Sequence, residues 1–130
     1  MGWPHVVAEV AETFDSLPLD DRATATILTS NYSEAGAINF WRDKYGLPEA
    51  ISGHNTYWWW GYGQPRGGPV IAVGLSKQVL DRYWADVQPV ALLGSDGFIV
   101  DPQEQGSVIW LCRDQKVPWE AIWLELRVYD

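Results

Sequence analysis

The sequence predicts an α/β fold: a three-layer Rossmann-like sandwich with a mostly parallel five-stranded sheet, in a single domain over residues 1–130. Two observations support this prediction. Apolar runs of strand length alternate along the chain with amphipathic segments of about ten residues, which is the pattern of α/β proteins. Residues 23–52 have the patterns of a strand, a helix and a second strand in succession, and such a unit favours a parallel crossover.

Five segments make up the first half of the predicted fold. Residues 3–14 repeat their apolar side chains at the helical period, with acidic side chains off the apolar stripe. Residues 17–22 are predicted to end this helix and turn the chain. Residues 23–30 are rich in β-branched side chains and predict a buried strand. A helix over 34–45 and a short strand over 50–52 follow.

The second half predicts three strands and two helices. The strands are expected over 70–75, 87–93 and 107–113, and Pro89 places the start of the second strand at an edge of the sheet or outside its ladder. Residues 94–106 lack a regular pattern and are predicted to form an exposed loop. The helices are expected from Ser76 to about Ala85 and from Pro118 onward, with Val79, Leu80, Tyr83 and Trp84 facing inward in the first and Trp119, Ile122, Trp123 and Leu126 in the second.

Charge and composition exclude several classes of function. The net charge of −8 argues against nucleic acid and anionic lipid as partners, because both require a basic surface. No apolar run approaches the roughly 20 residues that span a bilayer, and the start of the chain lacks the regions of a signal peptide. We therefore expect this chain to be soluble by itself.

The chain contains few residues that hold metals or cofactors. Cys112 is the single cysteine, which excludes an internal disulfide and a thiolate zinc site, and its strand context predicts a buried apolar role. The two histidines, His5 and His54, have no metal-binding spacing, so no metal site is predicted. The glycines of 61–67 resemble a dinucleotide fingerprint only superficially, because a strand follows them, and no cofactor is predicted.

The most unusual stretch is 51–61, where His54 and Asn55 precede four aromatic side chains in a row. The chain has nine tryptophans, and three of them are adjacent here. Three adjacent rings cannot all face one core, because side chains alternate in a strand and fan out in a helix. At least one ring is therefore expected near the surface or in a cleft. The alternative interpretation is that the rings cap the core and the following glycines turn the chain.

The predicted topology places the loops after the first and third strands beside this stretch. In an open parallel sheet, ligands bind beyond the carboxyl ends of the strands, where the strand order reverses. If the first and third strands are neighbours, the loops after the first three strands converge, with Ser76 beside the third. The candidate ligand-binding residues at this edge are Asn31, Tyr32, Glu34, His54, Asn55, Tyr57, Trp58, Trp59 and Trp60.

Two of these residues have chemistry of their own. Glu34 and His54 could form an acid–base pair across the predicted cleft. The alternative is that Glu34 caps its own helix and His54 bonds to backbone in a turn, since neither residue has a nucleophile or an orienting partner in view. No catalytic residue is assigned.

Several strings occur together in an order that points to a family. Their positions, by number, are 3–4 with 6–11, 15–18, 31–37, 45–48, 51–55 with 57–58 and 60–61, and 109–113. Ser-Gly-His-Asn followed by Tyr-Trp, together with Asn-Tyr-Ser-Glu-Ala-Gly, is the most specific set. The chain resembles, over nearly its whole length, the soluble carboxyl-terminal region of bacterial family 39, protein-mannosyltransferase-like, membrane glycosyltransferases. Residues 94–106 depart from that pattern in being more acidic and less aromatic.

The resemblance implies a domain excised from a larger membrane protein, located at the extracytoplasmic face of the bacterial cytoplasmic membrane. The whole protein would transfer a sugar from a polyprenyl-phosphate donor, with its catalytic acid in the membrane part. This chain would be an accessory domain whose partners are that membrane part and, at the aromatic loop, the sugar, the lipid carrier or the acceptor. The alternatives are a free-standing carbohydrate-binding module and a small hydrolase or transferase using Glu34 and His54.

Overall fold

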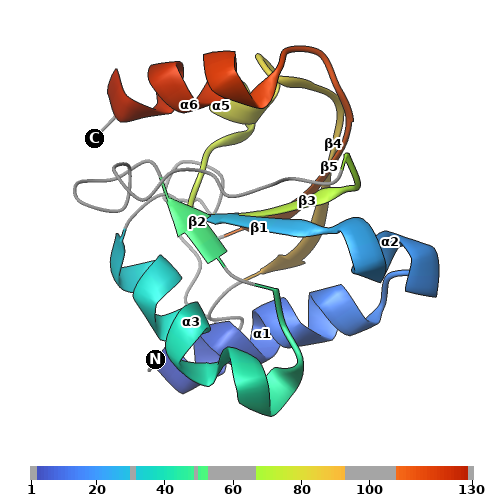
Figure 1. The fold of residues 1–130 in the computed structure, drawn as a ribbon, viewed down its shortest axis with the longest axis vertical. Helices are drawn as coiled ribbons and strands as arrows, with labels where there is room; N and C mark the ends of the chain where they lie inside the picture. Colours follow the sequence, from blue (N-terminus) through green and yellow to red (C-terminus); the bar gives the residue numbers. More distant parts are fainter. Residues whose placement is uncertain (1–2, 30–31, 49, 53–66, 93–107, 129–130) are drawn as a thin grey trace.

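The computed structural model of the chain describes residues 3–29, 32–48, 50–52, 67–92 and 108–128. Its centre is a five-stranded sheet in the order β2-β1-β3-β5-β4, with α1 and α3 on one face and α5 and α6 on the other (Figure 1). The elements, in chain order, are α1 (Trp3–Asp15), α2 (Leu19–Thr24), β1 (Thr26–Thr29), α3 (Tyr32–Tyr45), β2 (Ala50–Ser52), β3 (Val70–Val73), α5 (Lys77–Leu80), β4 (Trp84–Leu92), β5 (Val108–Gln115) and α6 (Trp119–Val128).

The sheet is mixed, so the prediction of a mostly parallel Rossmann-like sheet is wrong. β1 is parallel to β2 and to β3, whereas β5 is antiparallel to both β3 and β4. A parallel connection needs a crossover of a dozen or more residues, usually a helix. Residues 94–106 have no helical pattern in their sequence. An antiparallel arrangement of β4 and β5 agrees with this lack of a helical crossover.

A second correction concerns 76–85, which was expected to form one helix. Only Lys77–Leu80 is helical, and β4 already begins at Trp84. Trp84 is paired with Gln115 of β5 and lies almost fully buried, so strand pairing and aromatic packing prevail over the helical spacing of the apolar residues. Leu80, Tyr83 and Trp84 are nevertheless buried, as the apolar pattern predicted.

The region between α1 and β1 also differs from the prediction. Residues 17–22 were expected to form a turn, but α2 occupies Leu19–Thr24 and delays the start of β1 to Thr26. Asp20 and Asp21 lie in the first turn of α2, where negative charge interacts favourably with the helix dipole.

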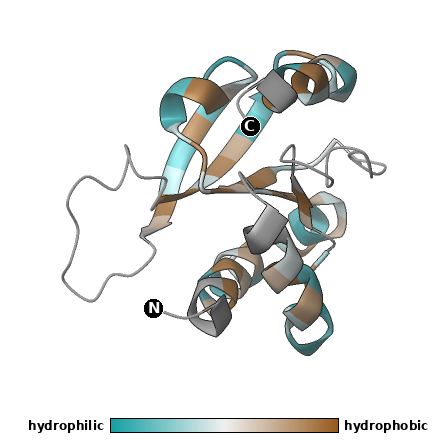
Figure 2. Cartoon of the chain, turned by 90° about the vertical axis from the view of Figure 1, so that its left-hand side faces the viewer, coloured by the Kyte–Doolittle hydropathy of each residue, from teal (hydrophilic) through white to brown (hydrophobic). Residues whose placement is uncertain are grey.

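The core on the α1 and α3 face confirms the apolar stripe that predicted the first helix. Val7, Val10 and Phe14 of α1 are buried against the sheet, together with Ile38 of α3. Figure 2 shows hydrophobic residues in the middle of the central sheet, and helices with one hydrophobic and one hydrophilic side. The helices of this face thus bury their apolar sides on the sheet and leave polar sides outward.

The core on the opposite face is built around tryptophans. Trp110 of β5 and Trp84 of β4 are almost fully buried there, and Trp119 contacts Trp84 edge-on with their ring centroids 5.8 Å apart. The final helix was predicted from Pro118 onward, and its predicted inward side is confirmed by the burial of Ile122, Trp123 and Leu126.

β4 forms one edge of the sheet, which agrees with the position that Pro89 predicted. The register of β4 against β5 shifts between Pro89 and Ala91, so the ladder is irregular at this point. Among the helices in the described part of the chain, none is both long enough and apolar enough to cross a membrane.

Candidate functional site

The carboxyl ends of three parallel strands lie level at one edge of the sheet. Thr29, the last residue of β1, is in register with Ser52 of β2 on one side and with Val73 of β3 on the other. The chain passes from β1 outward to β2 and then to β3 on the opposite side of β1. The strand order thus reverses between β1 and β3, and such a point is where open α/β sheets bind ligands.

The first turn of α3 follows this point directly. α3 begins at Tyr32, three positions after the end of β1, so the backbone of Tyr32 and Glu34 starts at the same edge. The first amide groups of a helix have no partner within the helix and carry a partial positive charge. The loops were expected to converge if the first and third strands are neighbours. β1 and β3 are neighbours, so this condition is met.

The candidate side chains themselves fall outside the part of the chain that the structure describes. This applies to Asn31 and to the whole aromatic segment, residues 54–60. For Tyr32 and Glu34 the backbone is described and the side chain is not. The distance between Glu34 and His54, and their role as an acid–base pair, therefore remain predictions. The same holds for the other members of the set, which are Asn55, Tyr57, Trp58, Trp59 and Trp60.

The short strand β2, which leads into the aromatic segment, is held from two sides. On one side, the Asn39 side chain of α3 donates to the Ala50 carbonyl at 3.2 Å and accepts from the Ala50 N–H at 2.8 Å. On the other side, the buried Thr29 hydroxyl donates to the Ile51 carbonyl at 3.2 Å. Ala50 and Ile51 of β2 are therefore held by α3 and by the end of β1.

The chain beyond β3 is fixed at the same edge. Gly74 has a φ of 82°, which an L side chain rarely adopts. The Leu75 carbonyl accepts a buried hydrogen bond from Trp110 Nε1 at 3.1 Å. Ser76, which we expected at this edge, caps α5 by accepting a hydrogen bond from the Val79 N–H at 3.3 Å. Its hydroxyl oxygen is thus already used within the fold.

One feature of this edge was missed in the sequence. Leu92 at the end of β4 pairs with Val108 at the start of β5, and Ile109 pairs with Val73 at the end of β3. The connection 93–107, which lies outside the described residues, therefore starts and finishes at the edge where β1, β2 and β3 end. The signal was present in the sequence, because a connection without a helical pattern implies an antiparallel return.

Chemistry by the single cysteine is disfavoured, in agreement with its predicted buried position. Cys112 is fully buried in β5, between Val70 and Val87 of the neighbouring strands. Burial, reinforced by the negative charges of Asp81 and Asp86, raises the pKa of the Cys112 thiol to about 12. The thiolate needed for nucleophilic attack is therefore scarce at neutral pH. Within the described ranges, no group of three or more His, Cys, Asp or Glu residues could hold a metal ion.

Comparisons with protein-family models, with curated protein sequences and with solved structures found no match to this chain.

Proposed function

We propose that the chain is an extracytoplasmic accessory domain of a polyprenyl-phosphate-sugar-dependent membrane glycosyltransferase. The aromatic segment 54–60 would be its contact surface for the sugar, the lipid carrier, the acceptor or the membrane domain. The ordered set of strings that resembles the family 39 carboxyl-terminal region supports the class. The sugar transfer itself would take place in the membrane part, so this domain contributes contact rather than chemistry.

The structural observation that carries the proposal is the register of Thr29 with both Ser52 and Val73. Because of this register, β1 and β2 end at the same level of the sheet, where the strand order reverses. Residues 30–34 follow the end of β1, and the aromatic segment follows the end of β2. Aromatic rings beside such an edge suit a ligand with both sugar and lipid character, because tryptophan offers an apolar face and a polar N–H.

The proposal can be tested by titrating the chain with a short-chain polyprenyl-phosphate hexose in detergent micelles. Polyprenyl phosphate alone and a free methyl hexoside serve as comparison ligands, and residue-resolved amide shifts serve as the readout. We expect the strongest response to the complete lipid-linked sugar. We expect that response to weaken in Trp58→Ala, Trp59→Ala or Trp60→Ala, because stacking on one aromatic ring contributes about tenfold in affinity.

Trp119→Phe is the matched control, because this half-buried ring belongs to α6, where it packs against Trp84, and is not part of the candidate segment. The control should bind like the unmodified chain. Equal binding of the free hexoside and of the lipid-linked sugar would instead identify a free-standing carbohydrate-binding module. Turnover of the sugar phosphate that is lost in Glu34→Gln would identify a hydrolase or transferase. Absence of any response would overturn the proposal.

A further inference from the structure

A polar cavity lies at the end of the sheet where β1, β3 and β4 begin, opposite to the end where the candidate site was placed. Its volume is about 220 Å³, and its walls come from α2, the turn before β3, the start of β4 and the end of β5. The structure brings these four segments together through pairing at that edge: the Thr26 N–H donates to the Pro69 carbonyl, and Trp84 pairs with Gln115. The cavity is therefore a product of the tertiary fold rather than of one loop.

The charged side chains that line this cavity are two carboxylates and one guanidinium. Arg113 Nη2 lies 2.9 Å from Asp21 Oδ2, and both side chains are only partly exposed, at 37% and 27%. Asp114 is the second carboxylate in the wall. The pair of Arg113 and Asp21 leaves the lining with one net negative charge, which disfavours phosphate and other anions.

The wall is also held in a defined shape. Among the described residues, Asp114 is the single non-glycine residue at positive φ, with a value of 59°. Aspartate is one of the few side chains that tolerate this conformation. The floor includes Trp84, which is buried against Tyr83 and Trp119. The ion pair of Arg113 and Asp21 and the buried Trp84 thus give two parts of the wall a defined position, and the exposed carboxylate of Asp114 is presented from a defined backbone conformation.

We propose that this cavity binds a neutral, polyhydroxylated ligand of about the size of one pyranose ring, through the carboxylates of Asp21 and Asp114 and the guanidinium of Arg113. Carboxylates accept from adjacent hydroxyls and a guanidinium donates to them, so the three groups match a neutral ligand that carries several hydroxyls. The volume lies below the roughly 300 Å³ at which pockets for drug-sized ligands begin. A single sugar ring fits this limit, whereas a nucleotide does not.

This inference goes beyond the proposed function and does not depend on it. The cavity is at the amino ends of β1, β3 and β4, whereas the aromatic segment follows the carboxyl end of β2. The cavity has reporter residues of its own, Asp21 and 113–115, so a residue-resolved measurement separates the two sites.

The test is a titration of the uniformly ¹⁵N-labelled chain with methyl glucoside, methyl galactoside and methyl mannoside, and in parallel with inorganic phosphate. We expect at least one glycoside to shift the amide signals of Asp21 and of 113–115 in a saturable way, while phosphate leaves them unchanged. Asp21→Asn and Asp114→Gly should each weaken this binding about tenfold, because each removes a charged acceptor.

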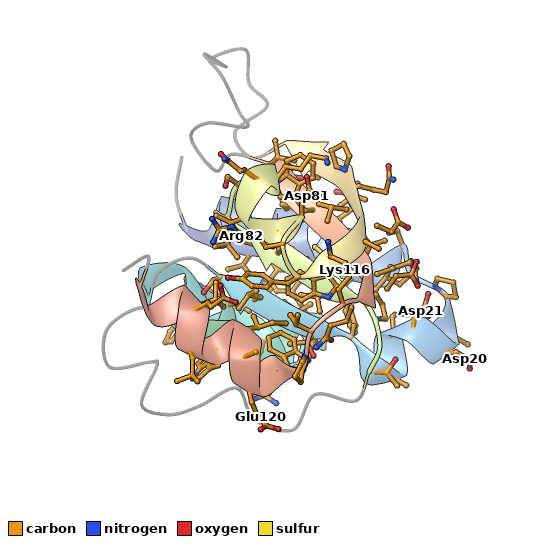
Figure 3. The ribbon with its side chains drawn as sticks, turned by 90° about the horizontal axis from the view of Figure 1, so that it is seen from above. Asp20, Asp21, Asp81, Arg82, Lys116 and Glu120 are labelled. Carbon is orange, nitrogen blue, oxygen red and sulfur yellow. The ribbon has the colours of Figure 1, made fainter. Side chains whose placement is uncertain are left out.

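Two features keep the test falsifiable. Glycine at position 114 suits a positive φ, so Asp114→Gly removes the carboxylate without straining the backbone. Asp20→Asn is the matched control: it removes the same charge from the same turn of α2, and Asp20 is exposed and absent from the cavity wall (Figure 3). Its binding should stay within about twofold of the unmodified chain. Absence of glycoside shifts at these residues, an equal response to phosphate, or unchanged binding in both test variants would overturn the inference.

Discussion

The side-chain amide of Asn39 bonds both backbone polar groups of Ala50. Its Nδ2 donates to the Ala50 carbonyl at 3.2 Å, and its Oδ1 accepts from the Ala50 N–H at 2.8 Å. Ala50 begins β2, the three-residue strand at one edge of the sheet. The amide thus takes the place of a neighbouring strand, and it satisfies an edge that would otherwise be open.

This relationship predicts that Asn39→Leu destabilises the fold and loosens β2. Two part-buried hydrogen bonds are lost and the Ala50 groups have no replacement partner, so we expect a loss of about 2–3 kcal/mol in the free energy of unfolding. Urea denaturation measures the loss, and hydrogen exchange of the Ala50 amide reports on β2 directly.

Asn39→Asp is the matched comparison, because it keeps an acceptor for the Ala50 N–H while it replaces the donor to the carbonyl with a negatively charged oxygen. Its Ala50 amide should remain better protected than in Asn39→Leu. Wild-type stability in Asn39→Leu would show that the contact does not hold the strand.

A second prediction concerns the close approach of the turn before β3 to α2. A Cβ atom added at Gly68 would lie 2.5 Å from the Thr24 carbonyl oxygen, and closer still to the Thr24 side chain. Backbone cannot move away cheaply here, because the adjacent Pro69 carbonyl accepts from the Thr26 N–H at 3.0 Å. We therefore expect Gly68→Ala to cost about 2–3 kcal/mol in the free energy of unfolding, measured by urea denaturation.

Gly67→Ala separates this steric effect from backbone strain. Gly67 has a φ of 79°, but a Cβ added there meets nothing within 4 Å. Its substitution should cost only about 1 kcal/mol, which is the strain of a left-handed alanine. If Gly67→Ala proved the more damaging of the two, the close approach at Gly68 would not be the controlling contact.

The sequence was sufficient for the elements whose apolar pattern is regular and long. The stripe that contains Val7, Val10 and Phe14 has the period of a helix, and the short continuous apolar run of β3 is typical of a strand with both faces covered; the structure has both. The spacing of Leu80 and Trp84 fits a helix equally well, and only the partner strand decides otherwise. Local periodicity carries no information about that partner.

The same limit applies to the candidate site. The strand ends could be placed at one edge because a strand, helix and strand unit constrains direction. The pairing of Val70 with Cys112 joins positions far apart in the chain, and no periodic signal specifies it. The insertion of β5 between β3 and β4 therefore had to come from the structure, whereas the lack of a helical pattern in 94–106 already pointed to an antiparallel return from the fourth strand.

A third prediction follows from the ion pair between Arg113 and Asp21. A double-mutant cycle with Asp21→Ala and Arg113→Ala should give a coupling energy of about 0.3–1 kcal/mol, because both side chains are partly exposed and solvent screens the attraction. The coupling should shrink in 1 M salt. The pair of Lys77 and Asp81, which is exposed and lies within one helix turn, provides a comparison cycle that should give a smaller value. A coupling near zero for Arg113 and Asp21 would contradict this assignment.

The last prediction concerns pH and Cys112. Burial raises the pKa of this thiol from its ordinary value of 9.0 to about 12. Below pH 9 the folded and unfolded chains both keep the proton, so the thiol adds no pH dependence. Between pH 9 and 12 the unfolded chain loses the proton while the folded chain retains it, so the free energy of unfolding falls as the pH rises, by about 1.4 kcal/mol for each pH unit.

Cys112→Ala should therefore show a shallower decline in stability than the wild type across this range, even though its cavity lowers the stability at pH 7. Urea denaturation at pH 7, 9 and 10.5 measures the difference in slope, and comparing slopes removes the constant effect of the cavity. At pH 8 the same pKa predicts about a thousandfold less thiolate in the folded chain than in the unfolded chain. Alkylation of the folded protein should be slower by at least that factor, and equal rates in the folded chain and in urea would refute both expectations.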